Sequence, residues 1–319
     1  ISGPIDRSNR FLPQLKVHQS FNERRITEGF RLVLFGLFKK VVIANQLASV
    51  VNGAYANLDV SNEYSLWIVL LIQPLYLYFD FSGYTDIAFG FARAFGIELV
   101  PNFNRPFVSE NMTEFWKRFH ISLSSWFHDY VFVRTVFRYR KWGKNASTFA
   151  LFLTWILFGI WHGAGWNFML LGLLQAIAIY YEYTTKKLRI SLLAKLPGII
   201  RIWTGRIFTY IFYAISLVFF FSPDLHSVFV FFSRITQYKG LIPGGIHIEI
   251  YIFSLFIVLI FLGLDVIKND FINFYNKIGS FWSSNKKKTF ISRWALYFVL
   301  ITLIIVFNKE VQQFIYFQF

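Results

Sequence analysis

The segment Gly159-Ile-Trp-His-Gly-Ala-Gly-Trp-Asn-Phe168 lies within residues 145–181, a run of 37 residues without Asp, Glu, Lys or Arg. Because about 20 apolar residues cross a bilayer as a helix, this run is long enough for two spans. Three glycines surround His162, and glycine lets a backbone bend or approach another segment closely. The pattern therefore predicts a helix, a break at His162 and a second helix.

An ionisable imidazole at membrane depth is costly, which makes His162 a candidate functional residue. The alternative is a buried histidine whose hydrogen bond holds two helices together. Histidine is also the natural general base for a hydroxyl near neutral pH. Backbone N–H groups released at the break and the nearby Asn167 would assist such a base. The apolar side chains that would exclude water from it are Trp155, Trp161, Trp166 and Phe168.

The composition is that of a polytopic membrane protein, since 55% of the 319 residues are hydrophobic and only 15% are charged. The net charge of +15 comes from basic residues between the apolar runs, which favours membrane lipids as partners over nucleic acid. The chain has no cysteine and no Gly-x-Ser-x-Gly motif, so direct transfer of an acyl group through one base is simpler than a covalent acyl-enzyme. The six histidines lack metal-ligand spacing, so no metal is expected.

Three gaps between apolar runs are strongly basic: residues 134–144, 186–206 and 268–293. The positive-inside rule places these gaps in the cytosol. This topology puts residues 223–249 on the other side of the membrane. It also places His162 deep in the membrane, away from the cytosol.

An apolar run at residues 64–79 continues directly into Asp80-Phe-Ser-Gly-Tyr-Thr-Asp-Ile-Ala88. Two carboxylates, a Ser, a Gly and a Thr between apolar segments predict a break that lines a polar cavity, with Asp80, Ser82 and Asp86 in its wall. The alternative is that Asp80 or Ser82 caps the helix that follows.

The sequence Asn111-Met-Thr-Glu114 has the spacing of a capping box and predicts a helix from there to about residue 130. His120 lies on the apolar face of this helix, so it is either a satisfied core histidine or a functional one. The residues that share this face are Trp116, His120, Leu123 and Phe127.

Four motifs follow one another along the chain: Tyr78-Phe-Asp-Phe-Ser-Gly-Tyr-Thr-Asp-Ile-Ala88, Pro101-Asn-Phe-Asn-Arg-Pro-Phe107, Glu114-Phe-Trp-Lys-Arg-Phe-His-Ile-Ser-Leu-Ser-Ser-Trp126 and residues 159–168. Together with the ending Phe314-Ile-Tyr-Phe-Gln-Phe319, they resemble the membrane-bound O-acyltransferase family. The resemblance is strongest to its bacterial branch of alginate O-acetyltransferase membrane subunits. It covers nearly the whole chain and implies the C-terminal portion of a longer protein whose upstream spans are absent. Residues 1–319 are then expected to form a single membrane-embedded domain.

The resemblance implies an all-α transmembrane bundle with short and broken helices around a buried site. It also implies that His162 is catalytic and that His120 is the second functional histidine. From their positions beside these histidines in the sequence, Trp161 and Trp116 are expected to line the site. The expected activity is transfer of an acetyl group to hydroxyls of an exported polysaccharide, as in alginate O-acetylation. The chain is expected in a bacterial inner membrane. The donor, acetyl-CoA or an acyl carrier, would reach it from the cytosol. No bound cofactor is implied, and the acceptor is the polysaccharide or an extracytoplasmic partner protein.

Two alternatives stay open from the sequence. One is transfer of another acyl group, such as D-alanine, to a cell-wall polymer. The other is a transporter whose polar path is lined by Asp80, Asp86, His120 and His162. One segment, residues 133–144, departs from the turn that the bacterial branch usually has, which bears on the identity of donor and partner.

Overall fold

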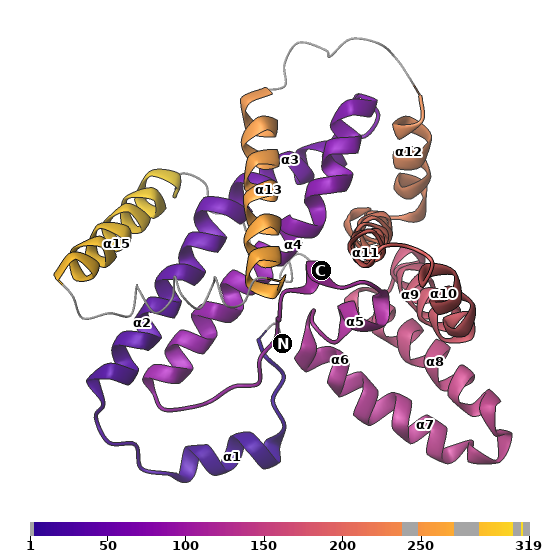
Figure 1. Ribbon diagram of the computed structural model, residues 1–319, viewed down its shortest axis with the longest axis horizontal. Helices are drawn as coiled ribbons and strands as arrows, with labels where there is room; N and C mark the ends of the chain where they lie inside the picture. Colours follow the sequence, from indigo (N-terminus) through magenta and orange to yellow (C-terminus); the bar gives the residue numbers. More distant parts are fainter. Residues whose placement is uncertain (1–2, 238–247, 271–286, 309–313, 315–319) are drawn as a thin grey trace. The chain divides into compact units, whose positions relative to one another are not determined.

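The computed structural model describes residues 3–237, 248–270, 287–308 and 314, and helices joined by loops make up these ranges (Figure 1). No strand occurs in the described ranges, where an isolated bridge joins Phe103 to Phe119. The predicted all-α class is therefore confirmed. The C-terminal motif lies outside the described residues, apart from Phe314.

Contacts along the chain define two compact units rather than one. Unit 1 consists of residues 1–50, 75–100 and 247–318, and unit 2 consists of residues 51–74, 101–246 and 319. The long helix α4 (Glu63–Ala94) supplies residues to both units. The prediction of a single embedded domain stays a prediction.

Unit 1 is built on the close crossing of α2 (Glu23–Leu37) with the second part of α4. A Cβ atom added to Gly29 would lie 2.5 Å from Gly90 O, and one added to Gly36 would lie 2.6 Å from Gly83 O. The paired glycines therefore let the two backbones touch, as small residues do between membrane helices. The other helical elements of this unit are α1 (Ser8–Lys16), the π-helix η1 (Phe38–Ala44), α13 (Ile248–Asp270), α15 (Lys287–Phe307) and the start of α3 (Asn45–Ala56).

The predicted break at residues 80–88 is wrong, because α4 continues through all of them. Neither Asp80 nor Ser82 caps a helix, so the alternative prediction fails as well. Their side chains are instead buried within unit 1, where Lys40 of η1 forms an ion pair with Asp80. Ion pairing to a neighbouring helix allows a carboxylate to remain inside a continuous apolar helix.

Unit 2 contains the two helices predicted around His162, α8 (Lys144–His162) and α9 (Trp166–Thr184). Helix α11 (Gly198–Phe221) packs against α9. The remaining helical elements of unit 2 are η2 (Pro106–Val108), α5 (Met112–Trp116), α6 (Ile121–Phe127), η3 (His128–Phe132), α7 (Val133–Arg138), η4 (Arg140–Trp142), α10 (Lys186–Leu193) and α12 (Leu225–Ile235).

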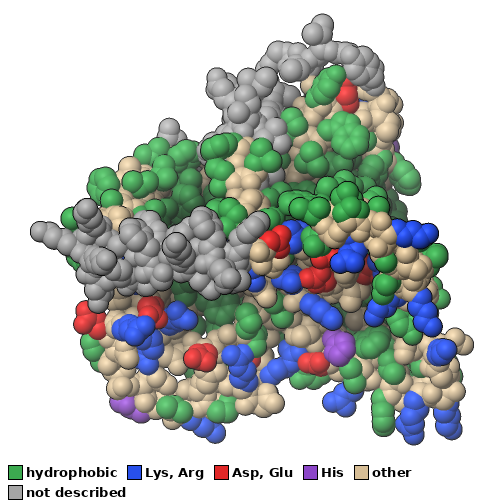
Figure 2. Space-filling model, in the orientation of Figure 1, with side chains coloured by type: hydrophobic (Ala, Val, Ile, Leu, Met, Phe, Trp, Pro, Cys, Tyr) green, Lys and Arg blue, Asp and Glu red, His purple; other side chains and the backbone are tan. Residues whose placement is uncertain are grey.

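Four stretches of described helix are long and apolar enough to cross a membrane: Glu23–Ala56, Glu63–Ala94, Gly198–Phe221 and Phe290–Phe307. Figure 2 shows one face of the molecule, on which many hydrophobic side chains are exposed and Lys and Arg side chains lie among them. Exposed apolar residues on this scale indicate a surface covered by lipid. Helices α8 and α9 form the predicted pair, although they are not among the four stretches.

Candidate active site

The α8–α9 hairpin places His162 at a break between two helices, as predicted. Helix α8 ends at His162, and α9 begins four residues later at Trp166. A Cβ atom on Gly159 would lie 2.1 Å from Phe168 O, and one on Gly172 would lie 2.0 Å from Trp155 O. Glycine at both positions is therefore what lets the two helices cross in backbone contact beside the break.

Aromatic rings surround His162 on several sides. The ring centroids of Trp161, Phe158 and Phe220 lie 4.9, 5.1 and 5.4 Å from that of His162, each in an edge-on arrangement. Phe220 comes from α11, so this helix closes the hairpin end. Of the predicted apolar walls, Trp161 touches the imidazole, whereas Trp166 is 68% exposed.

His120 lies between α5 and α6, where the structure corrects the prediction of one continuous helix. Its φ of 47° and ψ of 50° are left-handed, a conformation that costs a non-glycine residue about 1 kcal/mol or more. The chain turns there because the N–H of Ile121 donates to Asn102 O at 2.9 Å instead of continuing the helix. The result points the His120 side chain inward, where only 2% of the residue is exposed.

The two histidines belong to one cluster of side chains. The ring of Trp161 contacts both, since its centroid lies 6.3 Å from that of His120 and 4.9 Å from that of His162. His120 lies outside the four candidate membrane spans, and burial, together with the nearby His162, lowers its pKa well below the ordinary value. This shift favours the neutral imidazole, in which one ring nitrogen carries a proton and the other a lone pair.

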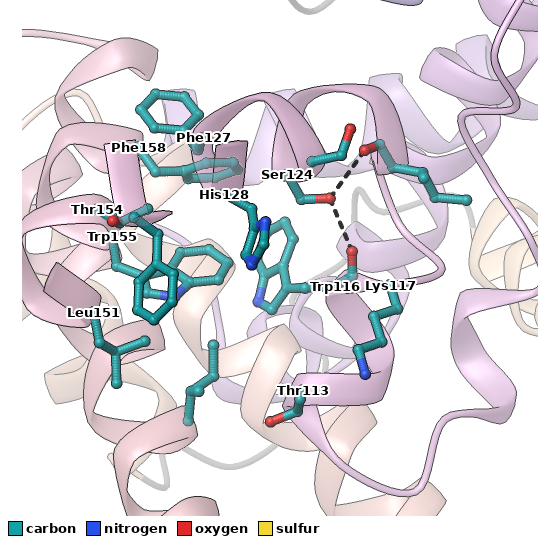
Figure 3. A pocket seen from close by; sticks show the side chains of 14 residues that line it. Thr113, Trp116, Lys117, Ser124, Phe127, His128, Leu151, Thr154, Trp155 and Phe158 are labelled. Atoms are coloured by element: carbon teal, nitrogen blue, oxygen red, sulfur yellow. Dashed lines mark hydrogen bonds between the residues drawn. The ribbon is translucent and has the colours of Figure 1, made fainter. Parts of the chain in front are cut away.

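An apolar cavity of about 550 Å³ opens beside this cluster (Figure 3). Trp116, Trp155 and Phe158 line it, and Phe158 also contacts the His162 ring. In Figure 3 the rings of Phe127 and Phe158 lie at one end and the polar side chains of Thr113 and Lys117 at the other. The remaining lining residues are Ile121, Ser124, Ser125, His128, Phe132, Leu151, Thr154 and Ile179.

Trp116 and Asn167, both predicted to line the site, have specific partners in unit 2. Trp116 donates its Nε1–H to Gln175 Oε1 at 3.1 Å, which fixes its ring against the cavity. Asn167 donates from Nδ2 to the carbonyl oxygens of Phe219 and Ser222, at 3.1 and 2.8 Å. These contacts tie the start of α9 to the end of α11, and a direct role of Asn167 in the reaction stays a prediction.

The other three predicted lining residues, Asp80, Ser82 and Asp86, belong to unit 1. Asp80 is paired with Lys40, and Asp86 accepts from Lys39 Nζ at 2.6 Å. Ser82 is 2% exposed on the same helix. Within unit 1 the visible role of the two carboxylates is to join α4 to η1.

Sequence reasoning missed two residues that organise the site. Asn102 faces His120 Nδ1 at 3.1 Å, and Glu182 accepts from the backbone N–H groups of Met112 and Thr113 at 2.6 and 3.0 Å. Asn102 stands in the motif of residues 101–107, which was the one available signal. Nothing local marks Glu182, because its partners lie about 70 residues earlier in the chain.

Comparison with known proteins identifies the family to which most of the chain is similar. Residues 1–223 match the model of MBOAT, the membrane-bound O-acyltransferase family. The chain is 37% identical over 176 residues to the probable alginate O-acetylase AlgI of Azotobacter vinelandii, covering 54% of this chain and 34% of the relative. It is 34% identical over 240 residues to the peptidoglycan O-acetyltransferase of Helicobacter pylori, covering 71% and 42%.

A teichoic acid D-alanyltransferase of Bacillus subtilis is 35% identical over 206 residues, covering 58% of this chain and 50% of the relative. The chain thus spans between about a third and a half of the length of these relatives. The family match covers well over half of the chain and includes both histidines, the motif of residues 101–107 and the α8–α9 hairpin. The chain therefore belongs to the membrane-bound O-acyltransferase family.

Proposed function

We propose that this chain carries the reaction site of an O-acyltransferase that moves acetyl groups onto hydroxyls of an exported or cell-surface polysaccharide. The observation that carries the proposal is the pair His162 and His120, joined through Trp161 and placed beside an apolar cavity. Two relatives named for acetyl transfer to alginate and to peptidoglycan support the acetyl group and the glycan acceptor.

In the proposed reaction His162 is the general base and removes the proton of the acceptor hydroxyl. The alkoxide oxygen attacks the acyl carbonyl of a thioester donor and forms the ester bond. The carbon–sulfur bond then breaks, and the thiolate leaves with the proton that the imidazole had taken. His120 orients or assists His162, and the aromatic walls exclude water and so suppress hydrolysis of the donor.

The cavity beside the histidines is a suitable place for the acyl end of the donor. Its volume of about 550 Å³ lies within the range of small-molecule pockets, about 300–1,000 Å³. Acetyl-CoA or an acyl carrier would reach it from the cytosolic side of a bacterial inner membrane that the chain crosses several times. A polysaccharide, or an extracytoplasmic transferase that passes the group on, would receive the acetyl group.

A second candidate is transfer of D-alanine, which the similarity to the Bacillus subtilis D-alanyltransferase supports. A transporter gains no support from the predicted polar path. Asp80 and Asp86 lie on an unbroken helix and are paired with lysines.

The test is the ester content of surface polysaccharide in cells that express the full protein with or without His162→Ala. We expect His162→Ala to abolish acetyl ester at equal membrane abundance, whereas the exposed His226→Ala serves as the matched control and keeps it. Membrane vesicles supplied separately with acetyl-CoA and with an aminoacylated carrier distinguish acetyl from D-alanyl transfer. Unchanged ester content in His162→Ala would refute the proposed base.

A further inference from the structure

Asn102 is a buried residue of the loop before α5, and pairing with the α5–α6 connection fixes its position. Its own carbonyl accepts from Ile121 N–H at 2.9 Å, and the N–H of Asn104 donates to Arg118 O at 2.8 Å. The residue is 1% exposed. These two backbone hydrogen bonds hold the Asn102 side chain directly beside His120.

The partners of Asn102 Oδ1 determine which nitrogen of His120 carries the proton. The backbone N–H of Ser122 lies 3.2 Å from this atom and its Oγ lies 2.8 Å away. Because a backbone N–H only donates, the Asn102 atom that faces it is the accepting amide oxygen. His120 Nδ1 lies 3.1 Å from the same oxygen and can bind it only as an N–H donor. The lone pair of a neutral His120 is then on Nε2.

We propose that Asn102 is a positioning residue, which fixes His120 with its proton on Nδ1 and presents Nε2 as the acceptor at the reaction site. The proposal rests on the transferase function proposed above. Two features separate this arrangement from ordinary packing. Asn102 Nδ2 is buried without a hydrogen-bond partner among the described residues, and His120 has a left-handed backbone. Both features cost stability, and such costs are typical of functional sites.

A purely structural role for Asn102 is the competing explanation, because its oxygen also binds the second residue of α6. Three variants separate the two roles. Asn102→Leu removes the acceptor and keeps the branching and number of side-chain heavy atoms, whereas Asn102→Asp keeps an acceptor oxygen for Nδ1–H. Ser122→Ala removes only the hydroxyl bond to the same oxygen and leaves the His120 contact in place.

The first measurement is the tautomer of His120 by solid-state NMR on the full protein in lipid, with ¹⁵N-labelled histidine and His120→Gln for assignment. We expect an Nδ1–H signal in the wild type and in Asn102→Asp, and loss of that preference in Asn102→Leu. A wild-type His120 protonated on Nε2 would overturn the proposal, and this result is decisive even when Asn102→Leu fails to accumulate. The measurement requires no acyl transfer, so it stands if the proposed function fails.

The second measurement is steady-state acetyl transfer by the same variants. We expect kcat of Asn102→Leu to fall by about 10²- to 10⁴-fold, the upper value being the cost of a catalytic histidine in the wrong tautomer. KM should stay within about threefold, Asn102→Asp should recover most of kcat, and Ser122→Ala should resemble the wild type. A folded Asn102→Leu with wild-type kcat, or an Asn102→Asp as inactive as the Leu variant, would overturn the proposal. An active His162→Ala would instead refute the proposed function.

Discussion

Substituting Gly159 by alanine tests whether the backbone crossing of α8 and α9 sets the position of His162. The added Cβ would lie 2.1 Å from Phe168 O, about 1.3 Å closer than the 3.4 Å at which ordinary contact begins. The next nearest atoms, Gly172 N at 3.0 Å and the Phe168 carbonyl carbon at 3.1 Å, also belong to the α9 backbone. No side chain can rotate away, so the two helices must separate.

The size of the effect follows from this displacement. Overpacking a well-packed contact costs about 1–3 kcal/mol, and a shift near 1 Å at a reacting group costs about 10²-fold in rate. His162 follows Gly159 by three residues, so it lies on the same side of α8 and moves with the crossing. We therefore expect Gly159→Ala to lower Tm by several degrees and to reduce acyl transfer about 100-fold.

The assay is thermal unfolding of the purified protein in detergent, combined with acetyl-ester formation in vesicles. Gly53→Ala is the matched control, because Gly53 also lies inside a helix but an added Cβ would meet nothing within 4 Å. That variant should be unchanged or stabilised by up to about 1 kcal/mol. Gly159→Ala combined with Gly172→Ala should cost less than the sum of the two, because both open the same crossing. A fully stable and active Gly159→Ala would refute the reasoning.

Two further predictions concern buried polar contacts. Lys40→Met should destabilise the protein by about 3–5 kcal/mol, because it removes the lysine that pairs with the buried Asp80. Adding Asp80→Leu should restore much of this loss, as measured by thermal unfolding. A double variant no more stable than Lys40→Met would contradict the prediction. Glu182→Gln should weaken the start of α5 by about 1–3 kcal/mol, since the carboxylate accepts from Met112 N–H, Thr113 N–H and Thr113 Oγ–H. Faster hydrogen exchange at the Met112 and Thr113 amides checks it, and unchanged protection of both would contradict it.

The break at His162 could be predicted because its signal is local. Glycines beside an imidazole in a charge-free run permit few structures other than two helices and a turn, and α8 and α9 begin and end accordingly. The all-α class was predictable for a different reason, since it follows from the composition of the whole chain. The N-cap at Asn111 was also local, and its Oδ1 accepts from Glu114 N–H at 2.8 Å as the capping box predicts.

The prediction at Asp80 failed because the decisive partner is distant in sequence. A carboxylate in an apolar run indicates a break only when nothing else neutralises it, and Lys40 lies 40 residues earlier. Lys39 of η1 pairs with Asp86 and Lys40 pairs with Asp80, and in each pair one charge makes the other tolerable inside the helices.

His120 shows that apolar periodicity reports burial more reliably than helix continuity. The four residues predicted to share one helical face are all buried, at 8% for Trp116, 2% for His120, 1% for Leu123 and 5% for Phe127. A helix interrupted by one left-handed residue keeps that burial pattern, so the pattern alone could not reveal the interruption. The interruption exists because the N–H of Ile121, the residue after His120, donates to the backbone oxygen of Asn102. The same loop places the side-chain oxygen of Asn102 beside His120 Nδ1. Burial of His120 could therefore be predicted from the sequence, whereas the contact with Asn102, the residue proposed to orient it, could be identified only from the structure.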